Sequence, residues 1–254
     1  MARRDTYYMN GTSLLNPLDV VRLAHDDYEP TLVAVREHFQ RPAPRMSYNW
    51  LYRNARFAIA AERGLTRGAV LAGLSALSTK RAQDQNLECW LLLEQLYNDK
   101  SSRCWDLDPV NLGFGRGHFI PVRPSAVRLD RETKRAAVVV VQPRKTFAPN
   151  HERMGMLGFI LAEACVAPAR ETLFAATPAV EMTVEFANLG TSPGGKTRWP
   201  RLQHLEEFPA PDVPLIKHRI GNLARALDVV RAENVAGRRR DRGRNQEPPG
   251  PLFE

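Results

Sequence analysis

The chain has 254 residues, of which 43% are hydrophobic and 25% are charged, and both values are ordinary for a globular protein. This composition excludes a collagen-like chain, a disulfide-dense mini-protein and a fully disordered chain. The 36 lysines and arginines outnumber the 28 aspartates and glutamates, so the net charge is +8. A basic chain favours acidic partners, with nucleic acid before an anionic membrane, although a merely soluble basic protein has the same balance.

The cysteines predict free thiols. There are three of them, Cys89, Cys104 and Cys165, and no two have the close spacing of a zinc site. We therefore expect a reducing, cytoplasmic location, and neither a metal nor a cofactor. No apolar run reaches the length of about 18 residues that a membrane helix needs, and no apolar segment follows Met1, so no membrane partner is expected.

Taken in chain order, the sequence divides into three parts. Residues 1–45 form an N-terminal helical segment, residues 46–236 the main domain, and residues 237–254 a basic, disordered tail. Within the main domain, apolar spacing predicts helix almost throughout 47–98. An irregular loop is expected at 99–117, because this segment holds three glycines together with aspartate and proline.

The second half of the main domain predicts strands and helices in alternation. A pair of strands is expected at 119–129 and 136–141, and the second strand is an unbroken apolar run typical of a central position. A helix with an apolar face follows and is expected to end at Pro168. Residues 181–186 alternate polar and apolar side chains, which predicts a strand with one face in water.

The last expected helix begins near Asp212 and has a narrow apolar stripe from Val213 to Val230. The stripe either docks on the domain or forms the seam of a homodimer. The order of elements predicts an α+β fold, with a helical N-terminal half followed by a small sheet. That sheet, a hairpin with one or two further strands, is packed by two helices.

A helix-turn-helix pattern runs from Ala60 to Leu77. Ala60 is small enough for a crossing helix, Gly64 suits the turn, and Thr66 would cap the second helix. In these residues the segment resembles the helix-turn-helix of bacterial regulators, which implies that Arg67 and Lys80 contact DNA. Two core helices joined by a glycine turn are the alternative.

Residues 190–197 match the pattern Gly-x-x-x-x-Gly-Lys-Thr of a P-loop. In such a loop the backbone cradles phosphates, the lysine reaches the terminal phosphates, and the hydroxyl holds magnesium. The nucleotide-binding residues implied are Gly190, Gly195, Lys196 and Thr197. A surface loop is the alternative, because Pro200 disfavours the helix that should follow.

A helix carrying Glu88, the hairpin at 118–147 and the next helix follow the element order of PD-(D/E)xK nucleases, and this order resembles the core of that family. The resemblance implies a metal-binding acid on the first strand, and an acid or Gln two residues before a Lys on the second. Gln142 occupies the latter place, but Arg144 replaces the lysine, Lys145 comes one residue late, and the first acid is missing. If the chain has this core, the resemblance implies a degenerate, non-catalytic version of it, in which only a basic edge facing DNA remains.

Together these features predict a nucleic-acid-binding or accessory protein rather than an enzyme, with DNA favoured over RNA and no catalytic residues. The expected contacts are Arg67, Lys80, Arg144, Lys145 and the tail arginines Arg238, Arg239, Arg240, Arg242 and Arg244. Clustered arginines gain affinity by releasing counterions from phosphates. A metal-dependent nuclease with an altered motif, a P-loop protein and a homodimeric partner-binding protein remain as alternatives.

Overall fold

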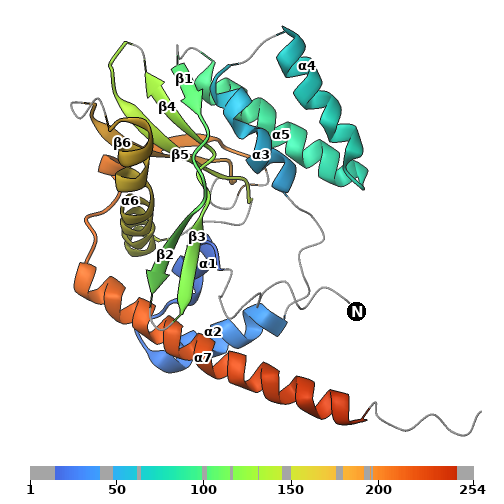
Figure 1. Ribbon diagram of the computed structural model, residues 1–254, viewed down its shortest axis with the longest axis vertical. Helices are drawn as coiled ribbons and strands as arrows, with labels where there is room; N and C mark the ends of the chain where they lie inside the picture. The colour runs from blue at the N-terminus through green and yellow to red at the C-terminus, as the bar shows by residue number, and fades with distance from the viewer. Residues whose placement is uncertain are drawn as a thin grey trace, which may run out of the picture.

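A computed structural model describes residues 15–40, 48–61, 64–98, 102–114, 117–130, 132–144, 150–175, 180–191, 195 and 197–244, with 234–244 through their backbone only. The strands are β1 (Ser102–Trp105), β2 (Val110–Phe114), β3 (His118–Val122), β4 (Ala126–Asp130), β5 (Ala136–Gln142), β6 (Met182–Asn188) and β7 (Arg201–His204). The helices are α1 (Pro17–Leu23), α2 (Tyr28–Gln40), α3 (Asn49–Ile59), α4 (Gly64–Ala72), α5 (Lys80–Tyr97), α6 (His151–Leu173) and α7 (Val213–Arg244), with short 3-10 helices η2 (Gly73–Ala76) and η3 (Leu205–Glu207). The expected α+β class is confirmed (Figure 1). Within these ranges no helix combines the length and apolar character that crossing a bilayer requires.

Strand β5 is the centre of a five-stranded sheet with the order β1–β4–β5–β6–β7. β4 runs antiparallel to β5, whereas β6 runs parallel to it because α6 carries the chain back to the starting edge. Successive side chains of a strand point to opposite faces, so Val138 packs on one side of the sheet and Val139 on the other. The expectation of a buried central strand at 136–141 is confirmed.

The sheet is larger than the sequence indicated. β1 and β2 both lie in the segment 99–117, where a loop was expected. Both strands are short. β1 pairs with the more distant β4 in the main sheet, whereas β2 pairs with the next strand, β3, in a separate two-stranded hairpin. Short strands leave a weak local signal in the sequence.

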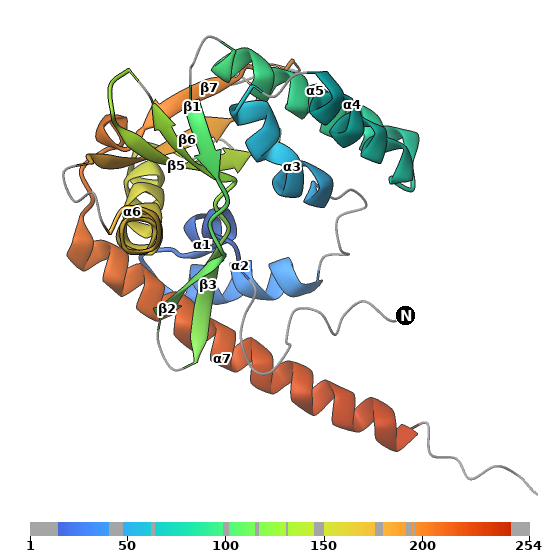
Figure 2. The same cartoon turned by 45° about the horizontal axis from the view of Figure 1, so that its top comes forward.

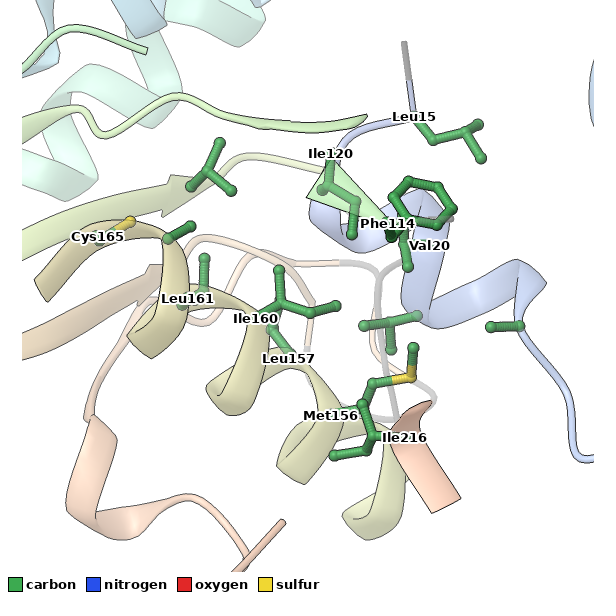
Figure 3. Packing of buried hydrophobic residues seen from close by; sticks show 14 of the residues in the cluster. Leu15, Val20, Phe114, Ile120, Met156, Leu157, Ile160, Leu161, Cys165 and Ile216 are labelled. Atoms are coloured by element: carbon green, nitrogen blue, oxygen red, sulfur yellow. The ribbon is translucent and has the colours of Figure 1, made fainter. Parts of the chain in front are cut away.

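Helices cover both faces of the sheet (Figure 1). One face packs against α6, and side chains of α1, of the β2–β3 hairpin and of α7 complete this core, as Figure 3 shows for Val20, Ile120, Leu161 and Ile216. The other face packs against α3 and α5. Residues of α1 and α2 therefore belong to the same core as the sheet, although the sequence suggested a separate segment up to residue 45.

Helix α6 continues past Pro168 to Leu173, so the expectation that Pro168 ends it is wrong. Proline removes one backbone N–H and crowds the carbonyl four residues earlier, which weakens a helix without always breaking it. Tertiary packing compensates here, because Ala169 and Phe174 beyond the proline are buried in the core.

Helix α7 docks on its own domain. Ile216, Leu223, Leu227 and Val230 are buried, and α7 lies beside α2 in both views (Figures 1 and 2). The apolar stripe is thus used inside the molecule, and the alternative of a homodimer seam on this stripe is wrong. The helix extends beyond the body of the molecule and through Arg244, which places residues 237–244 of the expected tail in a helix; residues 245–254 lie outside the described part.

Strand β6 buries a charge on the face that was expected in water. Glu181 is exposed as expected, but the carboxylate of Glu185 is buried and accepts hydrogen bonds from Arg128 and from the hydroxyl of Tyr97. Arg128 also donates to the Ser102 hydroxyl at 2.8 Å. Burial raises the pKa of Tyr97 well above its usual range, so this hydroxyl stays protonated and keeps donating. The ion pair joins β4, β6 and α5 inside the protein.

Replacing Glu185 by alanine should lower the free energy of unfolding by about 3 kcal/mol, because the buried Arg128 would lose its buried partner and keep only Asp130, at 3.6 Å, as an acidic partner. Urea unfolding followed by circular dichroism measures this loss. Glu181→Ala removes the exposed partner of Arg135 and should have a much smaller effect. Equal losses in the two variants would contradict the structural role of the buried pair.

Candidate functional site

The candidate site lies at the edge of the sheet where the parallel strands β5 and β6 end and the antiparallel strands β4 and β7 begin. We call it the carboxyl-end edge. The pairing places Gln142 opposite Asn188 and Asn188 opposite Arg201. Serine 125, just before β4, joins the same edge because its hydroxyl accepts the backbone N–H of Val141. In open α/β sheets, ligands bind outside the carboxyl ends of the strands, so this edge is the natural place to look for a site.

A buried arginine, Arg198, holds this edge together. Its guanidinium donates to the backbone carbonyls of Pro143 and Leu189, both at 2.6 Å, and these carbonyls follow the ends of β5 and β6. It also donates to a carboxylate oxygen of Glu88 and to the Tyr48 hydroxyl, each at 2.9 Å. The strand ends, α5 and the residue before α3 therefore share one anchor. Burial raises the pKa of Tyr48, and the nearby Arg198 opposes that rise.

A second arginine, Arg144, is positioned by the turn after β5. The buried side chain of Gln142 accepts from the backbone N–H of Arg144 at 2.6 Å and donates to its carbonyl at 2.7 Å. The guanidinium of Arg144 then donates to a carboxylate oxygen of Asp19 at 3.1 Å. Asp19 also accepts from the side-chain amide of Asn16 at 2.6 Å. Burial raises the pKa of Tyr52 to about 12, and the nearby Arg144 opposes that shift.

The acidic and amide side chains nearest the strand ends are engaged by protein contacts. Glu88 and Asp19 each accept a hydrogen bond from a guanidinium, and Gln142 is bound to the backbone. The described residues contain no group of three His, Cys, Asp or Glu side chains suited to a metal ion. The metal-binding positions implied by the nuclease resemblance are therefore engaged by protein contacts in this part of the chain; Lys145 lies outside it.

Arginines gather at the edge. Arg81 lies on the same face of α5 as Gln85 and Glu88, one and two turns away, and Arg123 precedes Ser125 at the start of β4. Both are exposed and form no ion pair within the described part of the chain. The edge arginines are Arg81, Arg123, Arg144, Arg198 and Arg201. Arg144 and Arg198 pair with Asp19 and Glu88, and Asp84, one turn from Arg81, pairs with Lys80. Arg81, Arg123 and Arg201 have no acidic partner within the described part of the chain.

An exposed tryptophan lies beside these arginines. The side chain of Trp199 is 52% exposed, and the guanidinium carbon of Arg201 lies 3.5 Å from the centroid of its ring. Neither residue was singled out from the sequence. The sequence signal was the pair Trp199 and Arg201 two residues apart in an extended segment, which places both on the same side of the chain.

The segment expected as a helix-turn-helix contains the helices α3 and α4 joined by a short turn, with differences in detail. α4 begins at Gly64, whose φ of +63° confirms the need for glycine in the turn. Thr66 lies inside α4 rather than at its cap, and no residue of α4 is buried. Arg67 pairs with Glu94 of α5 through two hydrogen bonds of 2.7 and 3.0 Å, and Lys80 pairs with Asp84. These two cations are engaged by acids instead of forming a free basic face.

The segment expected as a P-loop connects two antiparallel elements. Thr191 and Arg198 form an isolated β-bridge, and the chain then enters β7. Gly190 is buried, Gly195 and Thr197 are exposed, and Lys196 lies outside the described residues. The helix N-terminus that would receive a phosphate in a P-loop does not follow this loop in the described chain.

The tail arginines lie on the last turns of α7. The backbone of Arg238, Arg239, Arg240, Arg242 and Arg244 is helical, in the part of α7 that extends beyond the body (Figure 2). Arginine is a good helix former, which explains why the helix continues through this segment despite Gly237 and Gly243.

Comparison with protein families and with curated proteins finds no match. Among solved structures, the one described as "Crystal structure of SSO0001" is similar to this chain at 12% sequence identity, over 76% of this chain and 83% of that chain. The TM-score is 0.29, so this likeness carries no argument about fold or function.

Replacing Arg198 by methionine should lower the free energy of unfolding by about 3 kcal/mol, because two buried carbonyls and Glu88 would lose their donor. Arg198→Lys should restore little of this loss, since one ammonium group cannot donate to all four partners of the guanidinium at once. Chemical denaturation measures both variants, with Arg123→Ala as an exposed control at the same edge. A loss for Arg198→Met no larger than that of the control would contradict the anchoring role.

Proposed function

We propose that this protein binds nucleic acid through the carboxyl-end edge, as a binding or accessory protein without catalytic residues of its own. The observation that carries the proposal is a set of five arginines on segments that meet at one edge of the sheet, three of which have no acidic partner in the described part of the chain. The net charge of +8 supports it, since a basic chain attracts polyanions.

The chemistry of arginine supports a phosphate ligand. A guanidinium presents several N–H donors in a planar fork that matches the oxygens of a phosphate. Arg81 and Arg123 are exposed and without an ion pair in the described ranges, so they are able to bind a phosphate without first losing an acidic partner. Arg144 would contribute from its half-exposed position beside Asp19.

The residues proposed here to contact nucleic acid differ from those that the sequence predicted. Arg67 and Lys80 are less suited than expected, because each would have to leave an acid. Lys145 and Lys196 lie outside the described residues. The arginine-rich end of α7 is a second basic segment, which would add affinity without sequence preference. DNA remains the favoured partner over RNA, as the sequence suggested.

The proposal is tested by the salt dependence of duplex DNA binding in a matched pair of double variants. Arg81→Ala with Arg123→Ala removes two charges from the edge, and Arg170→Ala with Lys217→Ala removes two exposed charges from α6 and α7. Each lost phosphate contact should reduce the slope of log K against log salt by about 1. Fluorescence anisotropy with a labelled duplex over a range of salt concentrations measures that slope.

The edge variant should show a slope smaller by about 2 and weaker binding at low salt, while the control variant keeps the slope of the unmodified protein. Because both double variants have the same net charge, total charge does not explain a difference between them. Equal slopes in the two variants, or no binding of either duplex or single-stranded DNA by the unmodified protein, would refute the proposal.

A further inference from the structure

The ring of Trp199 is held in a defined position at the carboxyl-end edge. Its backbone N–H donates to the carbonyl of Gly190 at 2.8 Å, and its neighbour Arg198 is buried and fully engaged. Two residues later, Arg201 pairs with Asn188 at the start of β7. The chain on either side of Trp199 is thus fixed to the ends of β6 and β7, and the ring projects from a rigid frame.

One side of this ring is occupied by a cation. The guanidinium carbon of Arg201 lies 3.5 Å from the ring centroid, which is stacking distance. The side chain of Trp199 nevertheless remains 52% exposed, whereas Trp90 in the core is completely buried. A large exposed ring with one covered face leaves its remaining surface open to a planar ligand.

The surroundings of Trp199 distinguish it from the other exposed apolar side chains, which are Val33, Leu65, Leu91 and Phe119. Of these residues, Trp199 is the one that stacks on an arginine and follows a residue anchored at the edge. An aromatic ring beside several arginines is the combination by which proteins hold single-stranded nucleic acid, since bases stack on the ring and phosphates pair with the cations.

We propose that Trp199 and Arg201 form a stacking platform for an unpaired base, so that the edge prefers single-stranded nucleic acid to a continuous duplex. This inference rests on the proposed function and specifies its ligand. Inside a duplex, neighbouring bases cover both faces of every base, and a protein ring cannot stack there without opening the helix. An unpaired base has a free face, and every base offers such a face, so the platform carries no sequence preference.

The test compares a single-stranded oligo(dT) of about 12 nucleotides with a blunt-ended, fully paired DNA duplex, each titrated against the full chain at fixed salt. The variants are Trp199→Ala and Trp199→Phe, and Phe119→Ala serves as the control because Phe119 is an exposed aromatic on β3. Anisotropy measures affinity. Tryptophan emission is recorded with and without DNA for the unmodified protein and for Trp199→Phe. The difference between the two losses of emission on binding reports stacking at Trp199. Circular dichroism confirms that the variants are folded.

The unmodified protein should bind oligo(dT) more tightly than the duplex, and Trp199→Ala should lose about tenfold in oligo(dT) affinity, with Trp199→Phe between the two. Duplex affinity should not change, and Phe119→Ala should behave like the unmodified protein. If Trp199→Ala binds oligo(dT) as tightly as the unmodified protein, or if Trp199 emission is not quenched, the platform is refuted while the proposed function stands. If the unmodified protein binds neither DNA, the proposed function itself fails.

Discussion

The candidate site depends on the hydrogen bonds that the guanidinium of Arg198 donates. Parallel strands leave carbonyl groups at their ends, and buried carbonyls need a donor. Arg198 supplies it to Pro143 and Leu189, and its remaining N–H groups reach Glu88 and Tyr48. One side chain therefore fixes two strand ends, α5 and the approach to α3. Trp199 and Arg201 follow this anchor directly in the chain, and Arg144 follows Pro143, whose carbonyl accepts a hydrogen bond from Arg198.

The same anchor decides which chemistry the edge supports. A divalent ion needs several free carboxylate oxygens, but Asp19 and Glu88 each face a guanidinium. The surplus arginines point instead to an anion, and Arg81 and Arg123 are exposed to receive one. Trp199 adds an aromatic surface stacked on Arg201. Positive charge and an open ring on a rigid frame suit a polyanion with planar groups better than a small anion.

Much of the fold was predictable because it depends on local patterns. The apolar run of β5, the docking stripe of α7 and the positive φ of Gly64 each follow from neighbouring residues. The buried charges of the fold and of the site were not predictable, because their partners are far away in sequence. Glu185 meets Arg128 across 57 residues, and Arg198 meets Glu88 across 110. From local sequence alone, Glu185 and Arg198 would be expected in solvent and Trp199 in the core. The tertiary arrangement instead buries Glu185 and Arg198 and exposes Trp199.

Hydrogen–deuterium exchange, measured by mass spectrometry with and without oligo(dT), tests most directly whether the carboxyl-end edge is the binding surface. The account predicts slower exchange on binding in peptides that cover 197–203 and the turn at 142–144, since bound nucleic acid would cover the edge. Protection confined to α4 would contradict it and return the contact surface to the segment that resembles a helix-turn-helix. No protection at the edge, in a protein that binds oligo(dT), would contradict it equally.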